Sequence, residues 1–172
     1  MTTPVVCVVG RSGTGKTTLL EKLIAELKRR GYRVGTIKHN THGFEMDTPG
    51  KDSWRHAQAG SDVVVVASPH KLALIERLER ELTLDEIAAR IKNVDIIITE
   101  GYKRSDKPKI EVFRKELGSE LLIPRDELIA VVTNQPFALD IPQFDLNDVE
   151  GLASFIEKLF LAEKPMLNRT SL

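Results

Sequence analysis

The sequence predicts an α/β fold with a doubly wound, mostly parallel sheet and antiparallel edge strands. Short apolar runs rich in β-branched residues alternate with segments whose apolar residues recur at the helical period. A glycine-rich segment separates the first apolar run, 5–9, from the first helical segment. Such alternation is typical of parallel sheets built from right-handed strand–helix–strand units.

The glycine-rich segment, Gly10–Thr17, fits the pattern G-x-x-x-x-G-K-[ST] of the phosphate-binding loop, or Walker A motif. It stands between a strand and an amphipathic helix, which is the order that this motif requires. The alternative, a chance glycine turn before an ordinary helix, is disfavoured because both flanking elements are present. The chain is therefore predicted to be a P-loop NTPase with bound nucleotide and Mg²⁺.

Each position of this loop has an expected role. Three glycines let backbone N–H groups approach phosphate oxygens, and the following helix adds the positive end of its dipole. Lys16 is expected to reach the β- and γ-phosphates, and the Thr17 hydroxyl to ligate Mg²⁺. The residues of the motif expected to bind the nucleotide are Gly10, Ser12, Gly13, Thr14, Gly15, Lys16 and Thr17.

Composition limits the classes of partner. Lys plus Arg and Asp plus Glu both number 25, so the net charge is zero. This balance gives no reason to expect nucleic acid or an anionic membrane as partner, and it does little to oppose self-association. The single cysteine, Cys7, excludes an internal disulfide and is expected to be a buried, inert thiol.

Length and hydropathy favour one domain in the cytoplasm. The chain has 172 residues, and we expect a single nucleotide-binding domain over 1–164 with a tail over 165–172. The first strand begins by Val5, which leaves no room for a signal peptide. No apolar run approaches the roughly 20 residues that a spanning helix needs.

The remaining elements follow from periodicity and turn residues. Strands are expected at 33–38, 62–67, 94–100 and 128–133, of which the last three are expected to be buried, and helices are expected at 84–91 and 149–160. Residues 71–77 are predicted to form an antiparallel edge strand. Residues 110–114 alternate in polarity, which predicts a half-exposed strand.

A long polar loop, 39–53, leaves the carboxyl end of the second strand, where open α/β sheets bind ligands. Its Asp47 could close over the γ-phosphate as a catalytic residue; an ordinary loop acid is the open alternative. His39 and His42 have the spacing H-x-x-H. A transition-metal site there lacks a full ligand set, so polar loop histidines are the favoured interpretation.

Two acids on one predicted strand compete to be the magnesium ligand. Asp95 and Glu100 lie about 16 Å apart in an extended strand, so only one can reach the metal. If this strand runs parallel to 5–9, Glu100 lies at the edge that carries the glycine-rich loop. We therefore expect Glu100 to serve Mg²⁺ with Thr17, directly or through water; a solvated turn carboxylate is the alternative.

Several motifs together resemble one family. Besides the glycine-rich loop, they are Thr36–His39, Asp47–Ser53, Ala59–Gly60, Thr99–Lys103 and Pro108–Val112. This set resembles MobB, the family of molybdopterin-guanine dinucleotide biosynthesis adaptor proteins, from residue 1 to about residue 160. The phosphate-binding loop occurs in many families, whereas P-G-K-D-S together with the E-G-Y-K turn is more specific.

The resemblance implies a GTP-binding protein with weak GTPase activity. It would assist the molybdenum cofactor guanylyltransferase, which joins GMP to molybdopterin, and it would be a homodimer; whether molybdopterin binds directly is left open. By position, the phosphates would be bound by 13–18, which adds Thr18 to the loop residues. Lys16, Asp47 and Glu100 would be catalytic.

The N-K-x-D signature by which general GTPases recognise guanine is missing, so the residues themselves do not select guanine over adenine. Asn134 follows the strand 128–133, where a base-recognition loop would stand, and is expected to bind the base. Two other classes compete with the adaptor. A small-molecule kinase would need an arginine-bearing lid, for which 103–125 is the candidate. A partitioning-type ATPase is disfavoured by the zero net charge.

Overall fold

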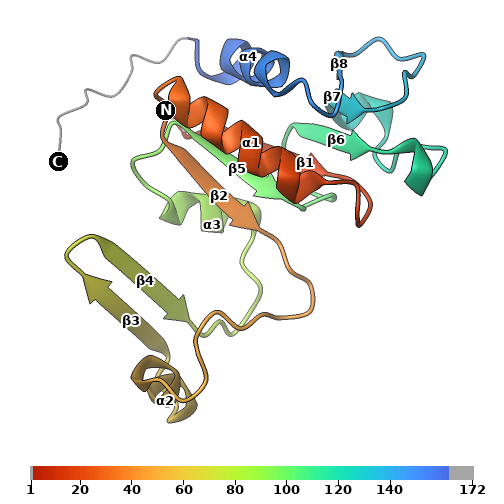
Figure 1. Cartoon of the computed structure of the whole chain (residues 1–172). Coiled ribbons are helices and arrows are strands. Elements are labelled where there is room, and N and C mark those ends of the chain that lie inside the picture. Colours follow the sequence, from red (N-terminus) through yellow and green to blue (C-terminus); the bar gives the residue numbers. More distant parts are fainter. Residues whose placement is uncertain (1, 163–172) are drawn as a thin grey trace. The chain divides into compact units, whose positions relative to one another are not determined.

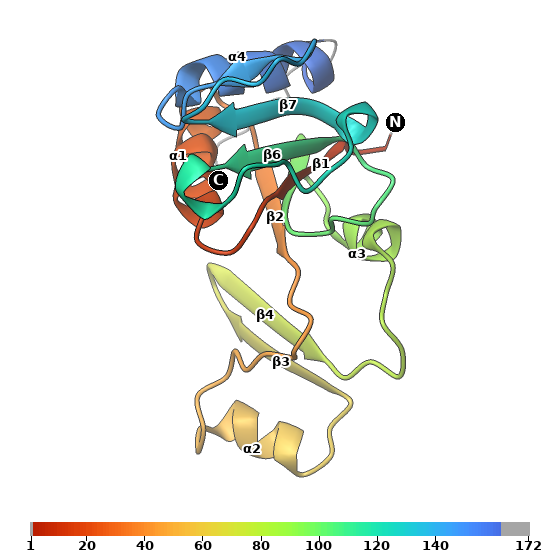
Figure 2. The same cartoon turned by 90° about the vertical axis from the view of Figure 1, so that its right-hand side faces the viewer.

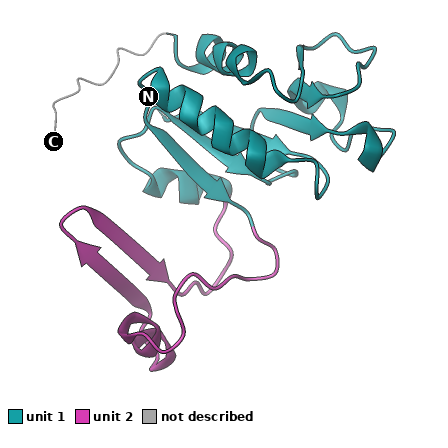
Figure 3. Cartoon of the chain, viewed as in Figure 1, with its two compact units in different colours: residues 1–39, 84–172 teal, residues 40–83 magenta. Residues whose placement is uncertain are grey.

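The computed structural model describes residues 2–162 (Figure 1). The predicted tail, 165–172, lies outside the described residues, as do residues 1, 163 and 164 of the predicted domain. The chain divides into two compact units (Figure 3). Residues 40–83 form the inserted unit, and the described residues on either side form the sheet unit. That 1–164 behave as one domain stays a prediction.

The sheet unit is built on six parallel strands in the order β2-β5-β1-β6-β7-β8. Because all six strands are parallel, their carboxyl ends lie at the same edge of the sheet. The β1 strand, which precedes the glycine-rich loop, lies inside the sheet between β5 and β6. The strands are β1 Val5–Val9, β2 Val34–Lys38, β5 Ile96–Glu100, β6 Lys109–Phe113, β7 Leu128–Thr133 and β8 Gln143–Phe144.

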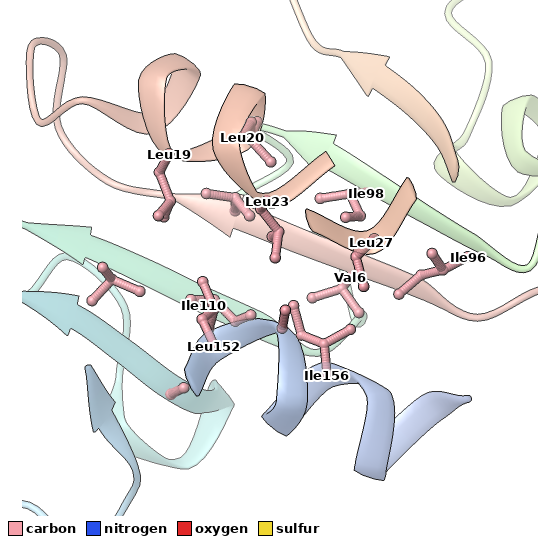
Figure 4. Packing of buried hydrophobic residues seen from close by; sticks show 14 of the residues in the cluster. Val6, Leu19, Leu20, Leu23, Leu27, Ile96, Ile98, Ile110, Leu152 and Ile156 are labelled. Atoms are coloured by element: carbon pink, nitrogen blue, oxygen red, sulfur yellow. The ribbon is translucent and has the colours of Figure 1, made fainter. Parts of the chain in front are cut away.

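Helices cover both faces of this sheet, as the doubly wound fold requires. α1 (Lys16–Arg29) and α4 (Val149–Phe160) pack on one face, and α3 (Leu84–Arg90) on the other (Figure 2). Successive residues of each strand point to opposite faces, so Val6 meets the α1–α4 side and Cys7 the α3 side. Figure 4 shows the apolar layer between the sheet, α1 and α4. The α/β fold and the buried Cys7 are confirmed.

The β6 strand is fully buried, so the predicted half-exposed strand at 110–114 is wrong. The polar residues of β6 do not face water; their side chains form hydrogen bonds with groups inside the protein. Lys109 is only 2% exposed and donates hydrogen bonds to the carbonyl oxygen of Ser105 and to the Glu127 carboxylate, at 2.6 and 2.8 Å. A buried lysine paired in this way meets the requirement that buried charges have partners.

Glu111, on the same strand, holds the segment that follows β6. Its carboxylate accepts hydrogen bonds from the backbone N–H groups of Leu122 and Ile123, at 2.8 to 3.1 Å. Burial raises the pKa of Glu111, and these N–H groups oppose that shift. The segment itself contains two short 3₁₀ turns, η1 Lys115–Leu117 and η2 Arg125–Glu127.

The inserted unit holds α2 (Asp52–Gln58) and an antiparallel hairpin of β3 (Val63–Ser68) and β4 (Lys71–Glu76). The predicted antiparallel pairing at 71–77 is therefore present, in a sheet of its own. The prediction that 62–67 is a buried strand is wrong, because most of β3 is exposed. One face of the hairpin is apolar and at least 46% exposed at Val63, Val65, Leu72 and Leu74.

No helix among the described residues is long and apolar enough to cross a membrane.

Candidate functional site

The glycine-rich loop joins β1 to α1 at the carboxyl edge of the sheet. Gly10 and Gly15 have φ angles of 145° and 91°, a region that side chains disfavour. A Cβ at Gly10 would also stand 2.4 Å from the carbonyl oxygen of Val112 on β6. The loop can therefore keep this path beside β6 only with glycine at position 10.

Lys16 folds back across this loop. Its Nζ donates to the carbonyl oxygens of Gly10 and Arg11, at 3.2 and 2.7 Å. Partial burial lowers the pKa of Lys16; the Glu100 carboxylate raises it, and the charges of Lys103 and Lys38 lower it further. The Lys16 ammonium thus lies against the loop, close enough to the ammonium groups of Lys38 and Lys103 to interact with them electrostatically. This concentration of positive charge favours the binding of an anion.

The other loop residues divide by exposure. Thr14 is buried, and its hydroxyl donates to the carbonyl oxygen of Arg11 at 3.0 Å, so this side chain stabilises the loop. Ser12, Thr17 and Thr18 are exposed, on the loop and the first turn of α1. They are accessible to a bound molecule.

Thr17 and Glu100 meet at this edge. The Thr17 hydroxyl donates to Oε2 of Glu100 at 3.0 Å. The predicted strand direction is confirmed, since β1 and β5 are parallel with Val8 opposite Glu100. Asp95 lies at the other end of the strand, where it accepts a hydrogen bond from the backbone N–H of Arg33. A hydroxyl and a carboxylate are hard oxygen donors, so this pair fits Mg²⁺.

Lys38 also contacts Glu100, a contact that was not predicted from the sequence. Lys38 is the last residue of β2 and stands opposite Glu100 in the β2–β5 register. Its ammonium donates to Oε1 of Glu100. Burial raises the pKa of Glu100, but the hydrogen bonds from Lys38 and Thr17, together with the nearby ammonium charges, hold it below its ordinary value. The sequence feature that could have indicated this contact is a basic residue at the end of a strand next to the one that ends in Glu100.

Arg114 is a second residue of the site that was not predicted from the sequence. It directly follows β6, and its Nε donates to the carbonyl oxygen of Thr14 at 2.9 Å. Its guanidinium lies against Gly15, where an added Cβ would be 3.3 Å from the nearest guanidinium nitrogen. Arg114 thus supports the glycine-rich loop from the adjacent strand end.

His39, the residue after Lys38, stacks on Tyr102, with ring centroids 4.3 Å apart. The backbone N–H of His39 donates to the carbonyl oxygen of Glu100 at 3.0 Å. These contacts join the two motifs Thr36–His39 and Thr99–Lys103. Across the described residues, no three His, Cys, Asp or Glu side chains are grouped as a metal site would require.

Asp47 lies in the inserted unit. Its Oδ1 accepts hydrogen bonds from the backbone N–H of Thr48 and the hydroxyl of Ser53, at 2.8 and 3.1 Å. Its Oδ2 is buried and has no hydrogen-bond partner among the described residues. A catalytic role for Asp47 stays a prediction.

Asn134 follows β7, one strand beyond β6, and its side chain is already engaged. Its Oδ1 accepts from the backbone N–H of Lys115, and its Nδ2 donates to both carboxylate oxygens of Glu116, each at 3.0 Å. The pKa of Glu116 is lowered, chiefly by this hydrogen bond from Asn134. Any contact of Asn134 with a base stays a prediction, and it would have to share these groups.

The chain is similar to proteins of one family. The family model of MobB, molybdopterin guanine dinucleotide synthesis protein B, matches residues 5–134. The chain is 44% identical over 160 residues to the molybdopterin-guanine dinucleotide biosynthesis adapter protein of Escherichia coli (strain K12), covering 89% of this chain and 91% of that protein. For the Haemophilus influenzae protein of the same name, identity is 39% over 156 residues, covering 90% and 88%.

Solved structures agree. The crystal structure of Bacillus subtilis MobB superposes with a TM-score of 0.75 at 28% identity, covering 93% of this chain and 99% of that one. A MobB homolog from Bacillus stearothermophilus gives a TM-score of 0.67 at 28% identity, covering 92% and 99%. These neighbours confirm the P-loop NTPase fold class. On the family match and these identities, the chain belongs to the MobB family.

Proposed function

We propose that this chain is a GTP-binding adaptor in molybdopterin guanine dinucleotide biosynthesis. It binds GTP with Mg²⁺, hydrolyses it slowly, and assists the molybdenum cofactor guanylyltransferase that joins GMP to molybdopterin. The observation that carries the proposal is the Thr17–Glu100 hydrogen bond beside the glycine-rich loop. The names of its relatives support an adaptor over a small-molecule kinase or a partitioning-type ATPase.

In this proposal Lys16 and the loop's N–H groups hold the phosphates, while Thr17 and Glu100 hold Mg²⁺. The metal would supply positive charge that offsets the charge of the phosphates. Glu100 orients the Thr17 hydroxyl, and Lys16 provides a point charge over the loop. Asp47 is proposed as a further catalytic residue on the basis of the family resemblance.

Guanine is proposed to be preferred over adenine. The Glu116 carboxylate, which Asn134 orients, offers two acceptors, as the aspartate of the missing N-K-x-D signature would. Guanine presents the ring N1–H and the exocyclic amine to such a pair, whereas the N1 of adenine is an acceptor. Both residues follow strands on the same side of β1, at the edge that carries the glycine-rich loop.

A homodimer is the proposed assembly. The exposed apolar face of the β3–β4 hairpin would be covered by a second copy of the chain. The zero net charge does little to oppose such association.

The nucleotide assignment is tested with Lys16→Ala and a fluorescent GTP analogue. Loss of the ammonium should nearly abolish binding of the analogue, because its charge faces the phosphates. Circular dichroism should show an unchanged fold. Unchanged affinity in the variant would reject the assignment.

The base preference is tested by displacing the same analogue with GTP or ATP. GTP should displace the analogue at a lower concentration than ATP. In Glu116→Gln, the ratio of the two displacing concentrations should fall about tenfold, because one carboxylate acceptor is replaced by an amide N–H₂ group. Equal competition by GTP and ATP in the unmodified protein would contradict a guanine preference while leaving triphosphate binding intact.

A further inference from the structure

The Glu100 carboxylate is shared between two groups of the chain itself. Oε2 accepts from the Thr17 hydroxyl at 3.0 Å, and Oε1 accepts from the Lys38 ammonium. The Glu100 side chain is only 12% exposed, whereas that of Lys38 is 65% exposed. A largely buried acid is thus neutralised by a cation that reaches in from solvent.

The register of the sheet places this cation. β2 and β5 are parallel, and Lys38 is paired directly with Glu100 as the last residue of each strand. Side chains at paired positions of neighbouring strands point to the same face. Lys38 therefore reaches Glu100 without any distortion of the backbone, and the contact is part of the fold.

The same carboxylate is the acid expected to support Mg²⁺. A metal beside Thr17 and Glu100 would stand within a few ångströms of the Lys38 ammonium. Two positive charges so close to each other repel, although solvent screens part of this repulsion at a protein surface. The ammonium and the metal therefore compete for one carboxylate.

We propose that Lys38 is a built-in counter-ion of Glu100, and that Mg²⁺ must displace it when the metal–nucleotide complex binds. This inference rests on the proposed function. Displacement is feasible because the lysine side chain is flexible and mostly exposed, and because an ion pair with one exposed partner contributes little. Lys38 then sets the Mg²⁺ concentration at which the nucleotide becomes bound.

The test compares Lys38→Met with Lys28→Met. Methionine keeps the length of the lysine stem and removes its charge. Lys28 is exposed in the last turn of α1, at the end of that helix away from the glycine-rich loop, so its variant is a control for a general loss of positive charge. The measurement is the Mg²⁺ concentration that gives half-maximal binding of a non-hydrolysable GTP analogue, determined by calorimetry.

Lys38→Met should lower this concentration about two- to fivefold, the upper part of the range expected when an exposed ion pair no longer competes. Lys28→Met should leave it essentially unchanged. Lys38→Arg, which keeps the charge, should behave like the unmodified protein. An unchanged or higher Mg²⁺ requirement in Lys38→Met, or an equal shift in Lys28→Met, would overturn the proposal.

A measurement without nucleotide separates this inference from the proposed function. Mn²⁺ binding to the protein alone, followed by electron paramagnetic resonance, should be tighter in Lys38→Met than in the unmodified chain. If no GTP analogue binds at any Mg²⁺ concentration, the proposed function fails, and the Mn²⁺ result alone decides the role of Lys38. Equal Mn²⁺ affinity in both proteins would then reject it.

Discussion

Two carboxylates at opposite ends of β5 illustrate how position along a strand decides chemistry. Glu100 ends the strand beside Thr17, whereas Asp95 precedes it and accepts a hydrogen bond from a backbone N–H at the opposite edge. The residue types are nearly equivalent, and only the direction of the strand distinguishes them. A pair of matched substitutions can therefore test the site.

Glu100→Gln should lower GTP hydrolysis roughly ten- to a hundredfold, because the group that orients Thr17 and supports the metal loses its charge. Nucleotide affinity should also become less dependent on Mg²⁺. Asp95→Asn should leave both properties nearly intact, since an amide oxygen can still accept from the Arg33 N–H. The assay is GTP hydrolysis over a magnesium titration, with circular dichroism as folding control; a crippled Asp95→Asn with an active Glu100→Gln would refute the placement.

Among individual residues, the Thr17–Glu100 pair was predicted from the sequence, whereas the contacts of Lys38 and Arg114 at the site were not. The pair follows from a motif and a strand direction. Lys38 and Arg114 end neighbouring strands, so their contacts depend on the strand order β2-β5-β1-β6, which periodicity does not contain. The contacts of Asn134 with η1 depend on the same order.

Among the elements, α1 and α4 are joined by a network of charged groups. Glu26 on α1 accepts hydrogen bonds from Arg29 and Arg30, at 2.7 to 2.8 Å. Arg30 also donates to Glu157 on α4 at 2.8 Å, and the Tyr32 hydroxyl donates to the same carboxylate. Hydrogen bonds from Arg29 and Arg30 lower the pKa of Glu26 from 4.5 to about 2.

This network predicts a loss of stability in acid. The folded-state pKa of Glu26 lies below its unfolded value, so its contribution is complete above about pH 5 and disappears as the pH falls toward 2. Glu26→Gln should therefore destabilise the protein at pH 7, and the difference from the unmodified chain should shrink below pH 4.5. Urea unfolding across this range measures it. Glu21→Gln, an exposed site on the same helix, is the control; parallel curves for the Glu26 variant and the unmodified protein would contradict the assignment.

The β6 strand shows where pattern analysis fails at the level of elements. Alternation in 109–113 indicates one exposed face, yet Lys109 and Glu111 are buried. The alternation of polar and apolar residues is the same whether the polar side chains face water or pair with buried groups inside the protein. The strands β1, β5 and β7 were predicted correctly as buried, because their uninterrupted apolar runs are typical of a sheet that is covered on both faces.

For the whole molecule, the fold class could be predicted and the inserted unit could not. The apolar run 62–67 has the composition of a core strand, but β3 pairs with β4 outside the main sheet. The apolar composition of 62–67 indicates that this strand should be shielded from water, but it does not indicate which part of the protein, or which partner, shields it. In the proposed assembly, the partner copy supplies that cover.

Leu74→Asp should weaken the proposed dimer at least tenfold, because it places a charge on the apolar face of the hairpin. Sedimentation over micromolar concentrations measures the association. Leu159→Asp is a matched control, since Leu159 on α4 is 50% exposed and Leu74 is 57% exposed. A purely monomeric unmodified protein, or equal weakening by both substitutions, would contradict a dimer through this face.

The order of the strands also has a consequence for how the chain reaches its native state. Val5 lies opposite Ile97 and Cys7 opposite Lys109, so the strand before the glycine-rich loop finds both neighbours only after most of the chain has been synthesised. Contacts so distant in sequence require large loops to close before they stabilise anything, which raises the relative contact order and slows folding. Until β5 and β6 have been synthesised, the edges of β1 have no partners, and we expect the nascent chain to be most prone to aggregation in this interval.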